Sequence, residues 1–259
     1  MPVPPLVEIE NASVTRGAQA VVYDLDLRID AGEHIAILGP NGCGKSTLIK
    51  TLTRELYPLY RTDLVNRLFG REIWDVFDLR SLLGVVSNDF ATPTKPISGL
   101  DIVVSNFFGS VGIWPHHQVT MEMVEASWNA LERLEATHLA ERMYEEMSSG
   151  EARRVLVARA LVHSPKALLL DEPSTSLDLF AQQELRSAMR KLAQSGLALI
   201  LVTHHLADII PEIDRVVLMK AGRIVADGPR RELLTKEWME RLFGVQVELS
   251  ERDGYLHAW

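Results

Sequence analysis

The chain lacks several features that mark specialised classes of protein. Its 259 residues include one cysteine, Cys43, so no disulfide can form within the chain, and a reducing cytosol is the expected compartment. No apolar run is longer than about six residues, whereas a helix that crosses a bilayer needs roughly 20. The sequence therefore excludes a disulfide-stapled scaffold and predicts no transmembrane segment.

Positive charge is also scarce. The 27 lysine and arginine residues are outnumbered by 35 aspartate and glutamate residues, which gives a net charge of −8. Because a sequence-independent grip on nucleic acid needs a basic face, no nucleic-acid partner is expected. The first five residues have neither a charged start nor an apolar core, so no signal peptide is expected. A content of 47% hydrophobic and 24% charged residues is typical of one ordinary globular domain.

A glycine-rich segment follows directly on the apolar run 35–38. It has the pattern G-x-x-x-x-G-K-[ST] of a phosphate-binding loop and consists of Gly39, Pro40, Asn41, Gly42, Cys43, Gly44, Lys45, Ser46 and Thr47. A buried strand, a tight turn and a helix that starts at Lys45 would direct several N–H groups and the positive end of the helix dipole at one anion. We therefore expect the segment to bind ATP, with Lys45 on the β- and γ-phosphates and the Ser46 hydroxyl on Mg²⁺. The alternative, a glycine-rich turn without a ligand, is disfavoured by the strand before it and the helix after it.

Two carboxylates end a second apolar run, at residues 167–170. Four apolar residues in succession are typical of a strand that is buried on both faces of a parallel sheet. Asp171 at its end is a candidate ligand of Mg²⁺. Glu172 is the candidate general base, since a base must lie within hydrogen-bond reach of the water that it activates. Taken without the rest of the sequence, Asp171 and Glu172 could equally be two solvated acids at the end of a strand. Because a phosphate loop precedes them in the chain, we interpret the pair as catalytic.

A helix is predicted over residues 152–162, and the segment before it carries a further motif. Ser148 and Glu151 have the S-x-x-E spacing of a capping box, so one interpretation is simply a helix start. Together with Ser149 and Gly150, however, they resemble the L-S-G-G-Q signature of the ATP-binding cassette (ABC) ATPases. Further matches are the D-loop, Ser176, Leu177 and Asp178, and the switch histidine, His204, after an apolar strand. These motifs occur in the family's order within residues 11–229.

The resemblance implies an α/β fold: a P-loop NTPase core with a mainly parallel sheet, an antiparallel β edge and an inserted helical subdomain. We expect one domain over residues 1–259, with the ATP-binding core at 1–86 and 159–228, the helical subdomain at 87–158 and a tail at 229–259. It also implies a head-to-tail dimer, in which ATP lies between the phosphate loop of one subunit and the signature residues of the other. His204 would then contact the γ-phosphate and keep Glu172 and the water aligned.

Four positions depart from the family pattern. Arg16 stands where an aromatic residue usually stacks on adenine, and we expect loose selectivity for the nucleobase. Asn88 stands for the glutamine of the Q-loop and is the candidate third Mg²⁺ ligand, acting through water. Ser149 replaces a glycine, and Glu151 replaces glutamine and is expected to cap the helix or face solvent. None removes the lysine, the metal ligand or the base, so an active ATPase is expected.

The apolar segment 97–114 leaves two functions open. It reads either as core of the helical subdomain or as a surface for a partner, because large exposed apolar patches usually mark interfaces. The resemblance favours a cytoplasmic ATPase subunit, peripheral on the inner face of the membrane, that energises a separate permease docked at residues 88–114. The alternative is a soluble stand-alone ABC ATPase that acts on a cytosolic partner. The tail resembles that of metal-chelate importer ATPases, and the transported substrate cannot be read from this chain.

Overall fold

The computed structural model describes residues 3–87, 90–91, 93 and 95–259. It forms two compact units, one of Met1–Leu79 with Ala198–Trp259 and the other of Arg80–Leu197. Asn88 lies outside the described residues, so its predicted role as a Q-loop ligand stays a prediction. The subdomain boundaries expected from the sequence likewise stay predictions.

The first unit has a buried, largely parallel set of strands at its centre. The strands run in the order β7-β3-β8-β9, with β3 parallel to β7 and β8, and β9 antiparallel to β8. Every residue of β3 and β7 is buried, which explains why both segments are continuous apolar runs in the sequence. The bounds are Ile35–Leu38 for β3, Ala198–Thr203 for β7, Arg215–Lys220 for β8 and Arg223–Pro229 for β9.

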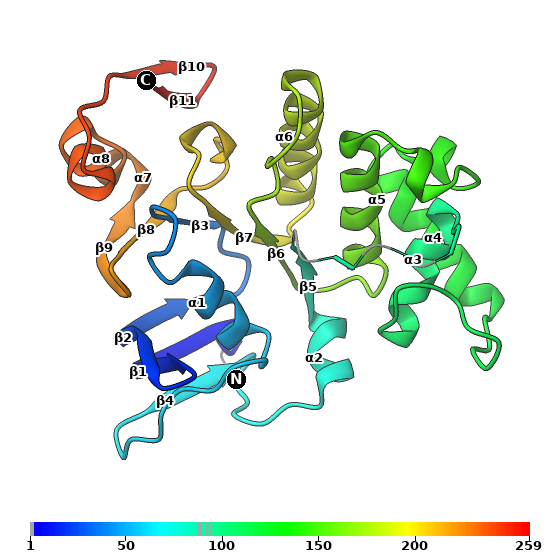
Figure 1. Ribbon diagram of the computed structural model, residues 1–259, viewed down its shortest axis with the longest axis horizontal. Helices are drawn as coiled ribbons and strands as arrows, with labels where there is room; N and C mark the ends of the chain where they lie inside the picture. The colour runs from blue at the N-terminus through cyan, green and yellow to red at the C-terminus, as the bar shows by residue number, and fades with distance from the viewer. Residues whose placement is uncertain (1–2, 88–89, 92, 94) are drawn as a thin grey trace. The chain divides into compact units, whose positions relative to one another are not determined.

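A second, antiparallel sheet in the same unit has the order β2-β1-β4 (Figure 1). Its strands are β1 (Val7–Arg16), β2 (Gln19–Ile29) and β4 (Val65–Leu68). Buried and exposed residues alternate along β2, as expected for a sheet with one face on the core. The loose alternation of apolar residues over residues 7–28 predicts a hairpin or edge strands, and β1 and β2 pair there as an antiparallel hairpin. The remaining elements of the unit are α1 (Lys45–Leu52), the 3-10 turn η4 (Leu206–Asp208), α7 (Arg230–Leu233), α8 (Lys236–Phe243) and the hairpin β10 (Leu249–Arg252) to β11 (Tyr255–Ala258).

The second unit is mainly helical and contains one parallel pair of strands, β5 and β6. Helix α5 packs against α3, α4 and α6. The bounds are β5 (Leu83–Val86), α3 (Gly99–Val104), η1 (Ser105–Phe108), α4 (Met121–Arg133), η2 (Thr137–Leu139), η3 (Tyr144–Glu146), α5 (Ser149–Leu161), β6 (Ala167–Asp171) and α6 (Leu179–Gln194); helix α2 (Val76–Leu82) crosses the boundary between the units.

Two helices are shorter than the sequence pattern suggests. Apolar residues at helical spacing predict one helix over residues 121–143, but α4 ends at Arg133. Glu135 then has φ of +53°, a left-handed conformation that no α-helix continues. The sequence also predicts that the helix after the phosphate loop continues to Leu56, before Pro58, but α1 ends at Leu52, and Arg54 follows with φ of +60°. Helix ends of this kind leave little trace in the periodicity, because apolar residues such as Leu56 and Leu139 recur beyond them.

The fold class agrees with the prediction: a mixed α/β structure with mostly parallel strands, an antiparallel edge and helices. In the part of the chain that the structure describes, no helix combines the length and apolar character needed to span a bilayer.

Candidate functional site

The phosphate loop joins the end of β3 to the start of α1. Helix α1 begins at Lys45, as the sequence predicts, and Gly44 before it has φ of +108°. Gly42 has φ of +78°, and a side chain there would meet no atom within 4 Å. Both glycines therefore supply backbone conformations that other residues adopt at a cost. Ser46 is exposed in the first turn of the helix.

The loop fits a nucleotide phosphate. Among the described residues, no main-chain carbonyl accepts a hydrogen bond from the N–H groups of Gly42, Gly44 or Ser46. These donors lie at or just before the N-terminus of α1, where the helix dipole is positive. The Lys45 ammonium reaches back over the loop and donates to the carbonyl oxygens of Gly39 at 2.7 Å and Pro40 at 3.2 Å. The segment thus carries a cation and several N–H donors within one short stretch of chain.

The turn at Gly222, which carries no phosphate-binding motif, contacts the phosphate loop. The Gly222 N–H donates to the Cys43 carbonyl at 2.9 Å, and a side chain on Gly39 would lie 2.3 Å from the Met219 carbonyl oxygen. Strand β8 and its turn therefore fix the backbone of the loop. Cys43 is only 3% exposed, which favours the interpretation that its sulfur fills a small buried position. No motif marks Gly222, because its role depends on the order of strands in the sheet.

The register of the parallel strands brings the phosphate loop and the switch histidine to one edge. Leu38, the last residue of β3, pairs with Thr203, the last residue of β7. The chain therefore leaves the sheet at Gly39 and at His204 from neighbouring positions. Carboxyl ends of parallel strands are the usual place for ligands in open α/β sheets.

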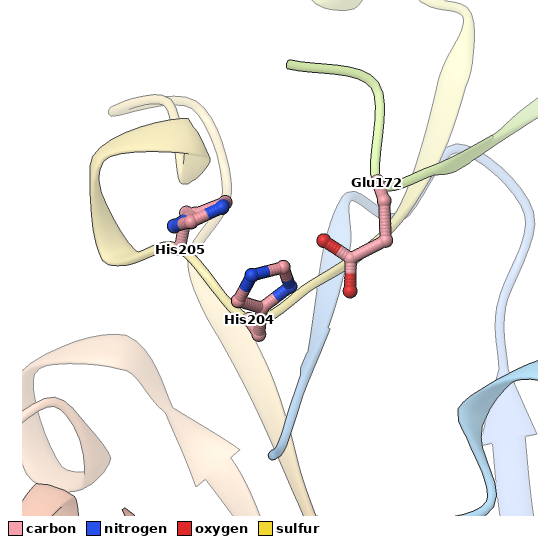
Figure 2. A group of neighbouring side chains, drawn as sticks. All are labelled: Glu172, His204 and His205. Atoms are coloured by element: carbon pink, nitrogen blue, oxygen red, sulfur yellow. The ribbon is translucent and has the colours of Figure 1, made fainter. Parts of the chain in front are cut away.

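The turn after β7 is held by buried polar groups. The Thr203 hydroxyl donates to the Asp208 carboxylate at 3.0 Å and accepts from the His205 N–H at 3.0 Å. Thr203 and Asp208 are almost completely buried, which makes these bonds stronger than they would be in water. The rings of His204 and His205 lie 3.8 Å apart between centroids, with His204 half-buried and His205 exposed (Figure 2).

In the second unit, Asp171 ends β6 and Glu172 follows it. Both are half-buried. Glu172, shown in Figure 2, has φ of +48°, an uncommon conformation for a residue with a side chain. Such strain is often kept at functional sites, because it directs a side chain where an extended strand would not. The half-buried Asp171 carboxylate offers oxygen atoms, the ligand type that Mg²⁺ prefers.

The signature segment forms the N-terminus of α5. The Ser148 hydroxyl accepts from the Glu151 N–H at 3.3 Å, and the Glu151 carboxylate accepts from the Ser148 N–H at 2.8 Å, so the predicted capping box is present. Arg142 pairs with the same carboxylate at 2.7 Å. The bond from the Ser148 N–H is the main cause that lowers the pKa of Glu151. Glu151 therefore caps the helix, as expected, and Ser148 and Ser149 are exposed at the tip.

Other predicted site residues occupy exposed turns. Asp178 caps α6 by accepting from the Ala181 N–H at 2.8 Å, while Ser176 is exposed and Leu177 is buried. Arg16 is exposed at the end of β1, where it pairs with Gln19 across the turn to β2.

The apolar segment 97–114 is partly core and partly surface. Ile102, Val103 and Val104 are fully buried, whereas Ile113 is 36% and Trp114 44% exposed. Arg159 ties the segment to α5 by donating to the Ser110 carbonyl at 3.0 Å, and burial lowers the pKa of Arg159 to about 10. The interpretation as core therefore holds for Ile102 to Val104, while a partner at the exposed end, Ile113 and Trp114, stays a prediction.

The chain is similar in sequence and in fold to known ATP-binding proteins of ABC transporters. A family model described as ABC transporter matches residues 22–175. A hemin import ATP-binding protein of Aliivibrio fischeri is 33% identical over 251 residues, which are 92% of this chain and 90% of that protein. A solved cassette from Clostridium perfringens, part of an ABC transporter complex, is 28% identical with a TM-score of 0.75 and coverage of 92% and 93%. A chain named as belonging to a metal-chelate type ABC transporter, in an inward-facing conformation, is 26% identical with a TM-score of 0.79 and coverage of 98% and 96%.

The fold and the phosphate loop define a P-loop nucleotide-binding ATPase. More narrowly, the chain belongs to the ABC transporter family and is an ATP-binding subunit of that family, an ABC ATPase that binds ATP.

Proposed function

We propose that this subunit hydrolyses ATP to energise a separate membrane permease, and that it works as a head-to-tail pair of ATPase subunits. The observation that carries the proposal is the pairing of Leu38 with Thr203, from which the phosphate loop and the switch histidine leave the sheet at adjacent positions. A nucleotide held by the loop thereby has a histidine within its own subunit that can sense the γ-phosphate.

In this proposal the phosphate loop, Gly39 to Thr47, holds the β- and γ-phosphates, and Lys45 neutralises their charge. Ser46 and Asp171 would hold Mg²⁺, with Asn88 as a further ligand through water; the ion, when bound, spreads the charge that develops on the phosphates. Glu172 accepts the proton of the attacking water, and His204 keeps that water and the γ-phosphate aligned. Arg16 lies flat against the base in place of an aromatic ring.

The signature residues act on the nucleotide of the partner subunit. Ser148 and Ser149 are exposed at the N-terminus of α5, where main-chain N–H groups and the helix dipole favour an anion. Gly150 and the capping residue Glu151 belong to the same turn, while Ser176, Leu177 and Asp178 form the turn before α6, with Ser176 and Asp178 exposed and Leu177 buried. A second copy, facing in the opposite direction, would complete the cage around the γ-phosphate and release it after hydrolysis.

The permease is proposed to dock at residues 88–114. Support comes from the exposed apolar end of this segment, Ile113 and Trp114, since exposed apolar side chains that gather beside one another favour an interface. The likeness to a hemin import subunit and to a metal-chelate type transporter favours import of a metal chelate. The subunit would then lie on the cytoplasmic face of the membrane, attached through the permease.

The test is the variant Glu172→Gln. It removes the base and keeps the size of the side chain and the phosphate contacts. We expect turnover to fall by roughly 10² to 10⁴, the range for loss of an acid–base group, while ATP binding persists and a dimer accumulates with ATP in size-exclusion chromatography. Glu125→Gln, on the exposed face of α4, is the matched control and should keep wild-type turnover. A Glu172→Gln protein that stays monomeric with saturating ATP would contradict the head-to-tail pair.

A further inference from the structure

We infer that Arg230 and the C-terminal hairpin β10–β11 form a brace that positions the turn carrying His204, and that Arg230 is therefore a positioning residue for hydrolysis. All the contacts lie within the first unit. The inference rests on the proposed role of His204, and its test is designed so that the two can fail separately.

Arg230 joins the hairpin to the segment that follows the switch histidine. One guanidinium nitrogen, Nη1, donates to the Ile210 carbonyl at 3.0 Å, and Nη2 donates to the Gly254 carbonyl in the turn of the hairpin. The main-chain N–H of Arg230 donates to the Asp214 carbonyl at 2.7 Å. A planar guanidinium with two fixed donor directions is suited to hold two carbonyls at a set spacing.

The hairpin also touches this segment directly. Gly254 has φ of +78°, and a side chain there would lie 2.9 Å from Pro211, so the turn of the hairpin rests on that proline. Strand β11 lies against η4. The far end of the hairpin is fixed as well, because Glu248 and Trp259 exchange main-chain hydrogen bonds at 2.9 and 3.2 Å and Lys236 pairs with Glu248 at 2.6 Å.

From η4 the connection to the histidine is short. The Asp208 N–H donates to the His205 carbonyl at 3.2 Å, and the Asp208 carboxylate accepts from Thr203. His204 therefore sits in a loop that is closed at one end by Thr203 and Asp208 and at the other by Ile210 and Pro211. The first end is built into the sheet; at the second, Arg230 and the hairpin hold the main chain beside the buried side chain of Ile210.

The surroundings of Arg230 stabilise the hydrogen bonds of its guanidinium group. Burial lowers the pKa of Arg230, while the nearby carboxylates of Glu251, Asp214 and Glu212 raise it. A half-buried cation among carboxylates keeps its hydrogen bonds with little screening by solvent. These carboxylates come from the hairpin and from the segment before β8, so the Arg230 cation attracts both of these segments.

The experiment compares ATP turnover and nucleotide binding in full-length variants. Arg230→Ala removes the clamp, and Gly254→Val pushes the hairpin away from Pro211 through its new side chain. We expect each to lower kcat about three- to tenfold with KM for ATP within about twofold of wild type, since the phosphate loop is untouched. Arg230→Lys, which can hold one carbonyl but not both in the same geometry, should give an intermediate kcat.

Two controls separate positioning from general stability. Arg252→Ala, on the same hairpin but 87% exposed, should leave kcat unchanged. In a His204→Ala background, Arg230→Ala should produce no further fall in kcat, because the group that it positions is gone; an additional fall of the same size would overturn the inference. If Arg230→Ala does not fold, Gly254→Val and Arg230→Lys carry the same comparison.

The proposed function and the brace fail in different ways. Wild-type turnover in His204→Ala would overturn the role of the histidine. Loss of turnover in His204→Ala, combined with wild-type kcat in both Arg230→Ala and Gly254→Val, would overturn the brace alone.

Discussion

Gly150 and Ala181 face one another so closely that a Cβ added to Gly150 would lie 2.6 Å from the Cβ of Ala181. Helix α5 and helix α6 are in contact at this point. The signature glycine therefore has a packing role in addition to any contact of its N–H group with a phosphate. Sequence comparison cannot separate these two roles, because both require glycine at one position.

Exchanging the two residues separates them. Gly150→Ala alone should cost about 1–3 kcal/mol of unfolding free energy through overpacking and should lower turnover. The double variant Gly150→Ala, Ala181→Gly moves the methyl group from one helix to the other and should recover most of that stability. Urea unfolding and ATP turnover are the measurements. A double variant that is stable but inactive would show that the nucleotide itself requires a bare Cα at residue 150.

The capping carboxylate Glu151 predicts a dependence of stability on acid pH. Its pKa is lowered from the ordinary 4.5 by the bond from the Ser148 N–H, so its contribution is complete above pH 4.5 and is lost as the pH falls through the lowered value. Glu151→Gln keeps the hydrogen bond without the charge. The free energy of unfolding of the wild type should exceed that of this variant by at most about 1 kcal/mol near neutral pH, and the difference should shrink as the pH falls below 4.5.

Unfolding curves of the wild type and of Glu151→Gln at neutral and acid pH test the direction of this pH dependence, with Glu125→Gln as the control. Because glutamine is the family's usual residue here, turnover at neutral pH should stay the same or rise. A difference that grows on acidification would contradict the assigned ion pair.

Arg16 predicts weak discrimination between nucleobases. Stacking of a base on an aromatic side chain is worth about 1–3 kcal/mol, and an exposed guanidinium offers the same flat surface to adenine and guanine. ATP and GTP should therefore support turnover within roughly tenfold of each other. Arg16→Tyr should lower KM for both, whereas Arg231→Tyr, on the exposed side of α7, should change neither. A hundredfold preference of the wild type for ATP would mean that another residue reads the base.

The burial of Cys43 predicts that its thiol reacts slowly with maleimide. A helix N-terminus and a nearby lysine favour a thiolate, and on that basis the sequence predicts a reactive Cys43 that Mg-ATP protects from maleimide, with a buried sulfur as the alternative. The side chain is only 3% exposed, however, so maleimide should label the native protein far more slowly than the protein in urea. Intact-mass measurement follows the reaction, and Cys43→Ser should keep its turnover. Complete labelling of native protein at the unfolded rate would show that the loop opens.

The parts of the site that depend on local pattern could be predicted from the sequence. The start of α1 at Lys45 follows from glycine spacing, and the capping box at Ser148 follows from an S-x-x-E pattern. Both are fixed within a few residues of the chain, where propensity and hydrogen bonding act alone.

The parts of the site that depend on strand order could not be predicted from the sequence. The support of Cys43 by Gly222 joins residues far apart in the sequence, and it exists because β8 lies next to β3. The pairing of Leu38 with Thr203 likewise follows from register, which two uniformly apolar strands do not specify through alternation. The ends of α1 and α4 also differ from the prediction, because a left-handed residue follows each helix while apolar residues recur further along the chain.

The left-handed backbone of Glu172 also limits which residues a mutational library can accept there. Glycine, asparagine and aspartate tolerate φ near +48°, whereas valine, isoleucine and proline do not. Inactive variants at this position should thus divide into two populations, one of normal cellular abundance and one depleted by degradation. Only the first population reports on chemistry, so abundance has to be read alongside growth before any loss of fitness at residue 172 is assigned to the missing carboxylate.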